Sequence, residues 1–345
     1  MPEVWFAVPG DPETLTGGYI YAKRLTAALR GRGWTVHALR LPGGFPNPST
    51  EDLAETQRLL GGLPSRATVL IDGLAFGAFT PAVLANLDLD IVALVHHPLA
   101  RETGLTASAA QISASREREA LRAARAVVAT SPHTASVLAT DYGVPQYKLS
   151  VAPPGTERRP RAPGHSHASS LLTVATVTPR KGHDLLVAAL ARIKNLTWTS
   201  TIAGSLERAP DTAAALRAQI AYSGLASRIA LTGELPDDAL AKLYAGADIF
   251  VLPSRYEGYG MVFADALAYG LPIVGCAAGA VVDTVPQNAA ILVPVDDAEA
   301  LADALRDLLT NANLRSSMAV AAWSAGQALP RWDDTAAIVA RALAG

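Results

Sequence analysis

The chain has 345 residues, of which half are hydrophobic and 17% are charged, and its formal net charge is -2. This length exceeds the range in which a single core keeps growing, so the composition predicts a folded chain of two domains and excludes a largely disordered one. Because the chain has no excess of basic residues, we expect no nucleic-acid partner.

Cysteine usage and the amino terminus bear on the cellular compartment. The single cysteine, Cys276, cannot form an internal disulfide, and Met1-Pro2-Glu3 lacks the basic start and apolar run of a signal peptide. Both features predict a cytoplasmic location. The apolar runs have the length of buried strands, so no transmembrane segment is expected. The sequence gives no indication of oligomeric state.

Strands and helices alternate through residues 1–155, which we predict to be the first domain. The helices are expected at 19–30, 111–126 and 132–142, and the buried parallel strands at 4–8, 34–39, 69–72, 91–95, 126–130 and 149–152. A stretch rich in proline and glycine follows, and residues 156–169 are predicted to be a linker.

The alternation begins again over residues 170–330, which form the predicted second domain. Strands are expected at 171–177, 199–203, 229–231, 249–252, 272–274 and 290–293, with helices starting at 184, 211, 237, 261 and 298 and a final helix starting at 331. This pattern predicts an α/β fold of two doubly wound domains. Ligands of such sheets bind beyond the carboxyl ends of the strands, so we expect the active site between the domains.

The richest motif lies in residues 254–274, which read as a strand exit, a glycine-rich loop, a helix and the next strand. Glu257 in the loop and Asp265 on the helix can both face a ligand that lies across the helix start. A helix start also offers free backbone amides and a positive dipole end. The residues placed to approach a diphosphate closely are Gly258, Tyr259, Gly260 and Met261.

This segment resembles a signature of glycosyltransferase family 4, in which two glutamates are separated by seven residues. Here Glu257 takes the first position and Asp265 the second. By the resemblance, Glu257 contacts hydroxyls of the donor sugar and Asp265 contacts the ribose. Each carboxylate taken alone would instead suggest a surface charge.

The resemblance implies a GT-B fold, with two Rossmann-like domains facing a cleft and the helix 331–345 packed back on the first domain. It implies a retaining transfer of a hexose-type sugar from a UDP- or GDP-linked donor, with no metal and no cofactor. The leaving phosphate oxygen would take the proton of the acceptor, so no side chain is needed as a nucleophile.

A basic segment, residues 174–184, lies where the first strand of the second domain meets its helix. Arg180 and Lys181 can stabilise a departing diphosphate without a metal. Since a helix start disfavours cations, their placement there is informative. The segment resembles the family's phosphate-binding loop, although Thr176 stands where the family often has an arginine.

In the first domain, two further motifs follow predicted strands. Gly17 and Gly18 resemble the family's glycine-rich loop that faces the donor phosphates, although a plain tight turn is an open alternative. His96 stands where the family often has a histidine that contacts the transferred sugar. His97 and Glu102 are expected to line the acceptor pocket.

Two other strand exits in the second domain fall on the same predicted edge. By the resemblance, backbone groups at the second exit help to hold the nucleotide base. The residues at the two exits are Gly204 and then Gly233, Glu234 and Leu235.

The sequence gives less support to several alternative functions and to a metal site. No Gly-x-Gly-x-x-Gly after a strand and no Walker-type loop occurs, which argues against dehydrogenases and kinases. Asp88-Leu89-Asp90 has the form of a metal-binding Asp-x-Asp but precedes a buried strand and is better explained as its start. His165 and His167 with Cys276 do not have zinc-ligand spacing.

The acceptor is less defined than the donor. A helix with Arg116, Arg118, Arg122 and Arg125 also carries Glu117 and Glu119, which favours a solvated face over a membrane-binding one. We therefore expect a small molecule or a glycan rather than a lipid. The alternatives are a non-catalytic nucleotide-sugar-binding protein, or an epimerase or phosphorylase on the same fold, although none of the five lysines suits a pyridoxal phosphate anchor.

Overall fold

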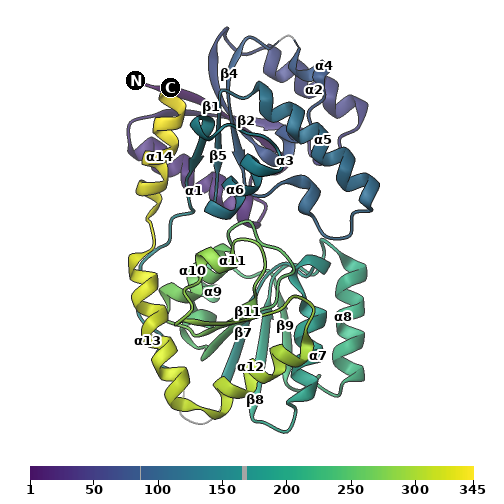
Figure 1. The fold of residues 1–345 in the computed structure, drawn as a ribbon, viewed down its shortest axis with the longest axis vertical. Coiled ribbons are helices and arrows are strands. Elements are labelled where there is room, and N and C mark those ends of the chain that lie inside the picture. Colours follow the sequence, from purple (N-terminus) through teal and green to yellow (C-terminus); the bar gives the residue numbers. More distant parts are fainter. Residues whose placement is uncertain (86, 165–168) are drawn as a thin grey trace. The chain divides into compact units, whose positions relative to one another are not determined.

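The computed structural model describes residues 1–85, 87–164 and 169–345, and these residues form two compact units. Unit 1 consists of Met1–Gly155 together with Pro330–Gly345, and unit 2 consists of Thr156–Leu329. Each unit has its own parallel sheet flanked by helices, as Figure 1 shows. The predicted α/β class with two doubly wound domains is confirmed.

Unit 1 contains a six-stranded sheet in the order β2-β1-β3-β4-β5-β6. Its strands are β1 (Glu3–Pro9), β2 (Thr35–Leu41), β3 (Ala67–Asp72), β4 (Leu89–Val95), β5 (Ala126–Ala129) and β6 (Leu149–Val151). Its helices are α1 (Gly17–Gly31), α2 (Thr50–Gly61), α3 (Gly73–Phe76), α4 (Pro81–Leu84), the short 3-10 helix η1 (Leu99–Arg101), α5 (Ala107–Ala123), α6 (Pro132–Thr140), the 3-10 helix η2 (Gln146–Lys148) and α14 (Trp332–Ala344).

The carboxyl-terminal helix α14 belongs to unit 1, where it contacts α1, β5 and β6. Thr335 donates a hydrogen bond of 2.6 Å to the Pro153 carbonyl. A Cβ at Gly155 would lie 2.1 Å from the backbone nitrogen of Trp332, so glycine is required for this close approach. The helix is therefore fixed at its first turn by backbone contacts.

Unit 2 repeats the design with the strand order β12-β11-β10-β7-β8-β9. Its strands are β7 (Ser169–Val174), β8 (Trp198–Ala203), β9 (Ile229–Gly233), β10 (Ile249–Leu252), β11 (Ile273–Cys276) and β12 (Ala290–Val293). Its helices are the 3-10 helix η3 (Pro179–Lys181), α7 (His183–Arg192), α8 (Pro210–Tyr222), α9 (Asp237–Ala245), α10 (Met261–Ala268), α11 (Val281–Thr284), α12 (Ala298–Thr310) and α13 (Ala312–Ala328).

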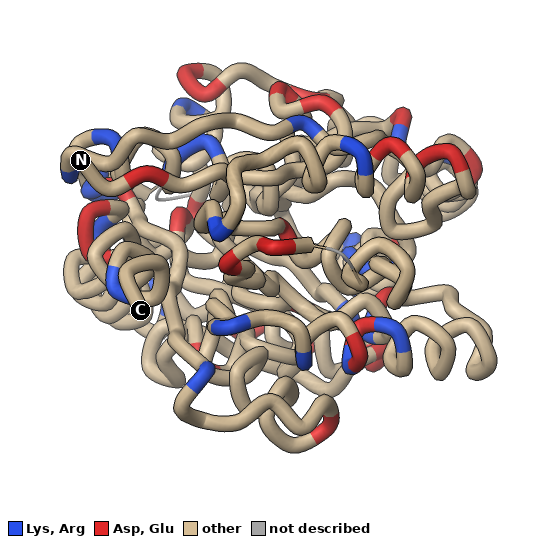
Figure 2. The backbone as a smooth tube through the Cα atoms, turned by 90° about the horizontal axis from the view of Figure 1, so that it is seen from above, with Lys and Arg blue, Asp and Glu red and all other residues tan. Residues whose placement is uncertain are grey.

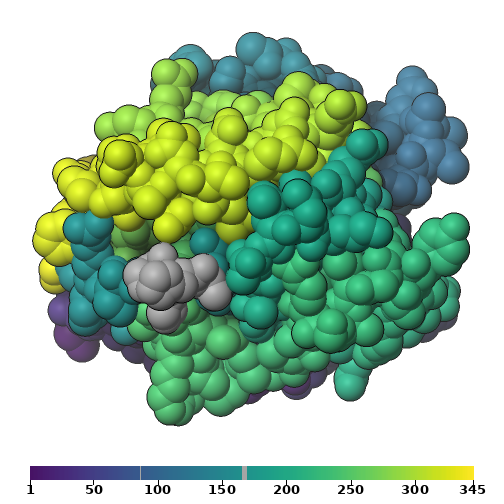
Figure 3. Space-filling view, turned by 90° about the horizontal axis from the view of Figure 1, so that it is seen from below, coloured from purple at the N-terminus to yellow at the C-terminus, as the bar shows by residue number. Residues whose placement is uncertain are grey.

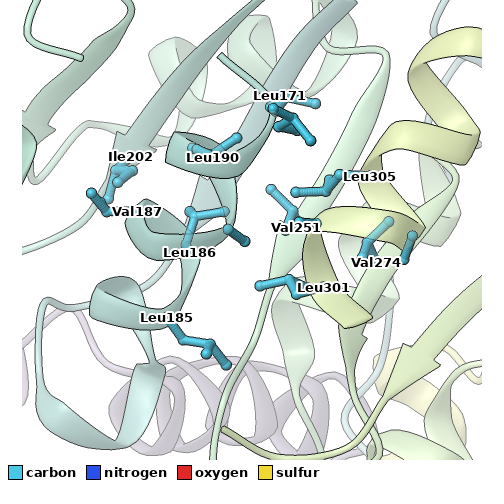
Figure 4. Packing of buried hydrophobic residues seen from close by; sticks show 14 of the residues in the cluster. Leu171, Leu185, Leu186, Val187, Leu190, Ile202, Val251, Val274, Leu301 and Leu305 are labelled. Carbon is cyan, nitrogen blue, oxygen red and sulfur yellow. The ribbon is translucent and has the colours of Figure 1, made fainter. Parts of the chain in front are cut away.

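The core of unit 2 forms where α7 and α12 cover one face of its sheet (Figure 4). Leu186 and Leu190 of α7 lie opposite Leu301 and Leu305 of α12, and all four are fully buried. Burial of such side chains contributes about 1.5–3 kcal/mol each. Figure 3 shows the same unit from below, where the yellow segments near the carboxyl end lie against the teal ones that begin the unit.

Two parts of unit 2 differ from expectation. The helix α13 was not predicted, because its alanines and serines form no apolar stripe, yet it packs closely on α10. A Cβ at Gly326 would lie 2.3 Å from the Leu267 carbonyl oxygen. The described part of the expected linker, residues 156–164, packs on the same unit, since Arg158 donates hydrogen bonds to the carbonyls of Gly326 and Leu329 at 3.2 and 2.8 Å.

Acidic and basic residues are interspersed along the chain, as Figure 2 shows. The predicted basic helix is α5, which ends at Ala123, so Arg125 lies beyond it and pairs with Asp90. Arg118 of α5 donates to the Asp141 carbonyl at 3.1 Å, so both arginines serve the fold. Within the described ranges, no helix has the length and apolar character needed to cross a membrane.

Candidate active site

In unit 2, the loops that leave β7 and β10 meet beyond the carboxyl ends of these strands. Gly182 adopts a positive φ of 67° between η3 and α7, and a Cβ there would lie 2.1 Å from the Pro253 carbonyl oxygen. Glycine is thus required both by conformation and by space. The Arg255 amide donates 2.8 Å to the Arg180 carbonyl, which joins the two loops directly.

The junction of these loops gathers two predicted basic residues, Arg180 and Lys181, and Ser254 around the predicted carboxylate of Glu257. Oε1 of Glu257 accepts hydrogen bonds of 2.6 Å from Nζ of Lys181 and from Oγ of Ser254. Arg180 lies 3.6 Å from Oε2 and donates 2.8 Å to the Tyr256 carbonyl. We call Arg180, Lys181, Ser254 and Glu257 the carboxylate cluster.

Glu257 is ionised despite its burial. Only 5% of this residue is exposed, and burial alone would raise the pKa of its carboxyl. The charges of Lys181 and Arg180, with hydrogen bonds from Lys181 and Ser254, more than offset burial and hold the pKa below its ordinary value. The cluster therefore carries two cations and one anion near neutral pH.

Arg255 connects the loops that carry the cluster through hydrogen bonds of its side chain. Its guanidinium binds Asp184 with two hydrogen bonds of 3.0 and 2.7 Å, Asp296 with one of 2.7 Å, and the Pro179 carbonyl. The hydrogen bonds to Asp184, the largest effect, raise the pKa of Arg255 further. The loop after β10 is thereby tied to the start of α7.

His183 follows Lys181 by two residues and begins α7. It is 2% exposed, and neither ring nitrogen has a hydrogen-bond partner in the part of the chain that the structure describes. Burial first, and the charge of Lys181 second, lower the pKa of His183 to about 4. The imidazole is therefore neutral and adds no charge to the cluster.

The glycine-rich loop that follows Glu257 leads into α10. Gly260 has a φ of 85°, and α10 begins with no side-chain cap and no acidic residue in its first turn. The first amides of the helix are thus left to other acceptors, which suits an anion. Thr284 donates 2.7 Å to the Tyr259 carbonyl and holds the loop in place.

Asp265 lies one turn beyond Met261 on α10 and is partly exposed. Its charge acts on the glycine-rich loop, because burial and then Asp265 raise the pKa of Tyr259. The charge of Asp265 on α10 thus reaches the glycine-rich loop.

The two other strand exits of unit 2 lie next to each other. Gly204 donates from its amide to the Gly233 carbonyl at 2.9 Å. A Cβ at Gly204 would lie 2.0 Å from the Ala175 carbonyl oxygen, so this exit touches the loop that carries Thr176. Glu234 is exposed and lies 4.0 Å from Arg208, while Leu235 is partly buried.

Unit 1 has its own group of predicted residues, centred on His96 after β4. Nε2 of His96 lies 3.4 Å from Oδ2 of Asp72, a distance that does not make a hydrogen bond. A Cβ at Gly18 would lie 3.6 Å from the same ring, and the ring of Tyr21 meets it edge-on at 5.1 Å. Gly17 begins α1. The structure thus brings the glycine pair and His96 together.

His97 and Glu102, the predicted acceptor residues, also lie together. Nε2 of His97 lies 3.4 Å from Oε2 of Glu102, and both side chains are partly exposed. They lie on either side of the short helix η1.

Sequence reasoning missed two members of these groups. Asp72 ends β3 and pairs in register with Leu94, two residues before His96, so only the pairing of β3 with β4 reveals it. Ser254 lies within the recognised motif, but its hydrogen bond to Glu257 needed the loop geometry.

The Asp88-Leu89-Asp90 segment lies at the start of β4 (Leu89–Val95). Asp90 pairs with Arg125, and Asp88 accepts a hydrogen bond of 2.5 Å from Ser65. No group of three or more His, Cys, Asp or Glu residues that could hold a metal ion occurs in residues 1–85, 87–164 and 169–345. His165 and His167 lie outside the described residues.

Two family models match the chain. The model described as Glycosyltransferase Family 4 matches residues 16–158, and the model described as Glycosyl transferases group 1 matches residues 168–311. Together the two models cover most of both units.

Curated relatives match a smaller share of their own length. An MMP alpha-(1->4)-mannosyltransferase of Mycolicibacterium hassiacum is 27% identical over 73% of this chain and 64% of its own. A D-inositol 3-phosphate glycosyltransferase of Mycobacteroides abscessus is 31% identical over 60% of this chain and 46% of its own. The chain thus spans less than two thirds of these relatives.

Solved structures match over the full chain. Sucrose-phosphate synthase of Thermosynechococcus elongatus has a TM-score of 0.84 at 22% identity, covering 99% of this chain and 98% of that one. HepE of Anabaena, solved with UDP and glucose, has a TM-score of 0.77 at 16% identity, with both chains fully covered. With the two family models and this GT-B architecture, the chain belongs to the family 4, or group 1, glycosyltransferases.

Proposed function

We propose that the chain is a retaining, metal-independent glycosyltransferase that moves a hexose-type sugar from a UDP- or GDP-linked donor to a small-molecule or glycan acceptor. The observation that carries the proposal is the carboxylate cluster at the start of α7, in which Lys181 and Arg180 converge on Glu257.

The cations of the cluster suit a diphosphate leaving group. As the bond between sugar and phosphate breaks, negative charge grows on the diphosphate oxygens, and fixed positive groups stabilise that charge. Arg180 and Lys181 are 17% and 16% exposed at their side chains, so a ligand can reach them while most water is excluded. They supply the positive charge that a metal ion supplies in other transferases.

Glu257 holds these cations in position and also faces the donor. One oxygen accepts from Lys181 and Ser254, while Oε2 lies 3.6 Å from Arg180. A carboxylate oxygen with spare acceptor capacity can bind sugar hydroxyls. Beyond it, the uncapped start of α10 offers amides to the phosphates, and Asp265 offers a carboxylate to the ribose.

His96 and Gly18 in unit 1 are proposed to contact the transferred sugar and the donor phosphates. The acceptor hydroxyl then attacks on the face from which the diphosphate departs, and the departing phosphate oxygen takes its proton. A new bond to the anomeric carbon replaces the bond to phosphate, and configuration is retained without a protein nucleophile.

The similar proteins suggest candidates for the donor base and for the acceptor. One relative from Mycobacterium tuberculosis, 28% identical over 64% of this chain, is named as GDP-mannose-dependent, whereas HepE was solved with UDP. The acceptors in the names of the relatives differ from one to another.

The test is turnover. The purified chain is incubated with UDP- and GDP-linked hexoses in EDTA, and mass spectrometry follows release of the nucleotide, with the anomer of the product read by NMR. Release from one donor with retained configuration supports the proposal. Binding without release would favour a nucleotide-sugar-binding protein, and an inverted product would exclude retention.

A further inference from the structure

A buried carboxyl on α5 of unit 1 lies beneath the segment that carries the predicted histidines. Glu117 is 1% exposed, and its Oε2 accepts a hydrogen bond of 2.9 Å from the Leu99 amide. Its Oε1 has no hydrogen-bond partner within the described parts of the chain. Leu99 follows His97 by two residues and begins η1.

The histidine segment is held at two points, one on each side of His97. On the first side, Thr130 and Thr134 each lie 3.2 Å from the His96 carbonyl and donate to it. On the second side, Glu117 holds the Leu99 amide. Loss of either hold would free the backbone that orients His96 and His97.

Three elements converge on this carboxyl. A Cβ at Gly77, after α3, would lie 3.1 Å from Cγ and Oε1 of Glu117 and 3.0 Å from Leu99 Cδ1. The space around Oε1 therefore has no room for a larger residue at position 77. Two cavities of about 160 Å³ each are lined by residues that neighbour Glu117. Gly77 and Leu99 line one cavity, and Tyr142 lines the other.

We propose that Glu117 is a positioning residue that holds the histidine segment through the Leu99 amide, and that the segment opens more readily as the pH rises because burial keeps this carboxyl protonated in the closed form. The proposal rests on the proposed function, because it gives the segment its role in transfer.

Ionisation of Glu117 would place a charge on a buried carboxyl that has an unpartnered oxygen. Burial, the largest effect, raises its pKa to about 8 from an ordinary value of 4.5, and the hydrogen bond from the Leu99 amide lowers it only in part. The helices α3 and α4 present no titratable residue to it. The charges nearby are Arg101 of η1, which pairs with Asp141 at 2.7 Å, and Arg118 of α5.

Opening of the segment exposes Glu117 to water, where its ordinary pKa returns. Because the pKa of Glu117 is raised in the closed form, the closed form loses stability relative to the open form as the pH rises from 4.5. This loss levels off above about 8. Hydrogen exchange at the Leu99 amide reports this opening directly. Its protection should fall about tenfold per pH unit below that level.

The experiment is hydrogen exchange of the full chain between about pH 6 and 9, corrected for the intrinsic exchange rate. In the natural chain, the protection of the peptide that contains Leu99 should fall as the pH rises. The same fall is expected in Glu119→Gln, which removes an exposed carboxylate from the same helix. Glu117→Gln keeps an acceptor for Leu99 and cannot ionise, so its protection should not depend on pH. Absence of the fall in the natural chain, or its persistence in E117Q, would overturn the proposal.

Turnover of the donor identified above gives a second readout. The natural chain should lose turnover as the pH rises towards about 8, above which the loss levels off, and E117Q should retain it. Identical pH profiles would contradict a positioning role. If no donor is turned over at all, the proposed function fails, while hydrogen exchange still decides whether Glu117 holds the segment.

Discussion

Nζ of Lys181 lies 2.6 Å from Oε1 of Glu257, and both side chains are more than four fifths buried. The two residues are 76 positions apart in sequence, and they meet because β7 and β10 are neighbours in the sheet. The pair fixes a cation beside the uncapped start of α10, and the first prediction concerns that cation.

Lys181→Ala should lower turnover of the nucleotide sugar by about 100- to 1,000-fold, because it removes charge from the point where the diphosphate departs. Steady-state kinetics measures the loss, and circular dichroism checks the fold. Lys194→Ala, an exposed lysine of the same unit, is the matched control. Turnover in K181A equal to that of the control would rule out the role of Lys181.

Asp265→Glu should preserve or increase affinity for the nucleotide, since it lengthens the carboxylate to the form common in the family. Calorimetric titration measures the affinity, with Asp307→Glu on the exposed face of α12 as control. A large loss of affinity would mean that the pocket is built around aspartate or lies elsewhere.

Asp72→Asn should lower turnover about tenfold or more while leaving nucleotide affinity unchanged. Asparagine keeps the cap of α3, in which Oδ1 accepts 2.8 Å from the Leu74 amide, but it removes the charge beside His96. Asp333→Asn, an exposed residue of α14, serves as the comparison. If turnover is unaltered in D72N, Asp72 does not act through His96.

Glu257→Gln should change how stability depends on pH. A folded-state pKa below the ordinary 4.5 stabilises the fold above that pH, and this stability is lost as the pH falls through the lower folded-state value. Gln cannot ionise, so E257Q should lose less stability in acid. At neutral pH it should be less stable by about 3 kcal/mol, because two cations lose their partner.

Denaturant unfolding between about pH 3 and 7 measures both effects. Ser254→Ala is the companion variant, since it removes one hydrogen bond to Glu257 and keeps the charges. Parallel pH curves for the natural chain and E257Q would show that Glu257 is not the ionised partner of Lys181.

Much of the fold could be predicted because buried parallel strands have continuous apolar sequences, as in residues 249–252 and 91–95. The helix α13 could not, since alanine and serine on every face leave no periodicity for a pattern to detect. Its packing against α10 instead depends on the small Gly326.

Some residues of the candidate site could likewise be predicted from the sequence, and others could not. Arg180, Lys181 and Glu257 were found because each lies in a short motif at a strand exit. Asp72 was missed because a lone aspartate at the end of a strand has no local pattern, and its neighbour His96 is reached only across the β3–β4 pairing. The ion pair of Lys181 with Glu257 likewise depends on tertiary contacts.

The most direct test of a nucleotide-sugar site at the carboxylate cluster is calorimetric titration of the natural chain and Lys181→Ala with UDP, GDP and ADP in EDTA. We predict micromolar binding of one nucleotide to the natural chain and markedly weaker binding to the variant. Failure of all three nucleotides to bind the natural chain, or equal affinity for both proteins, would contradict the account.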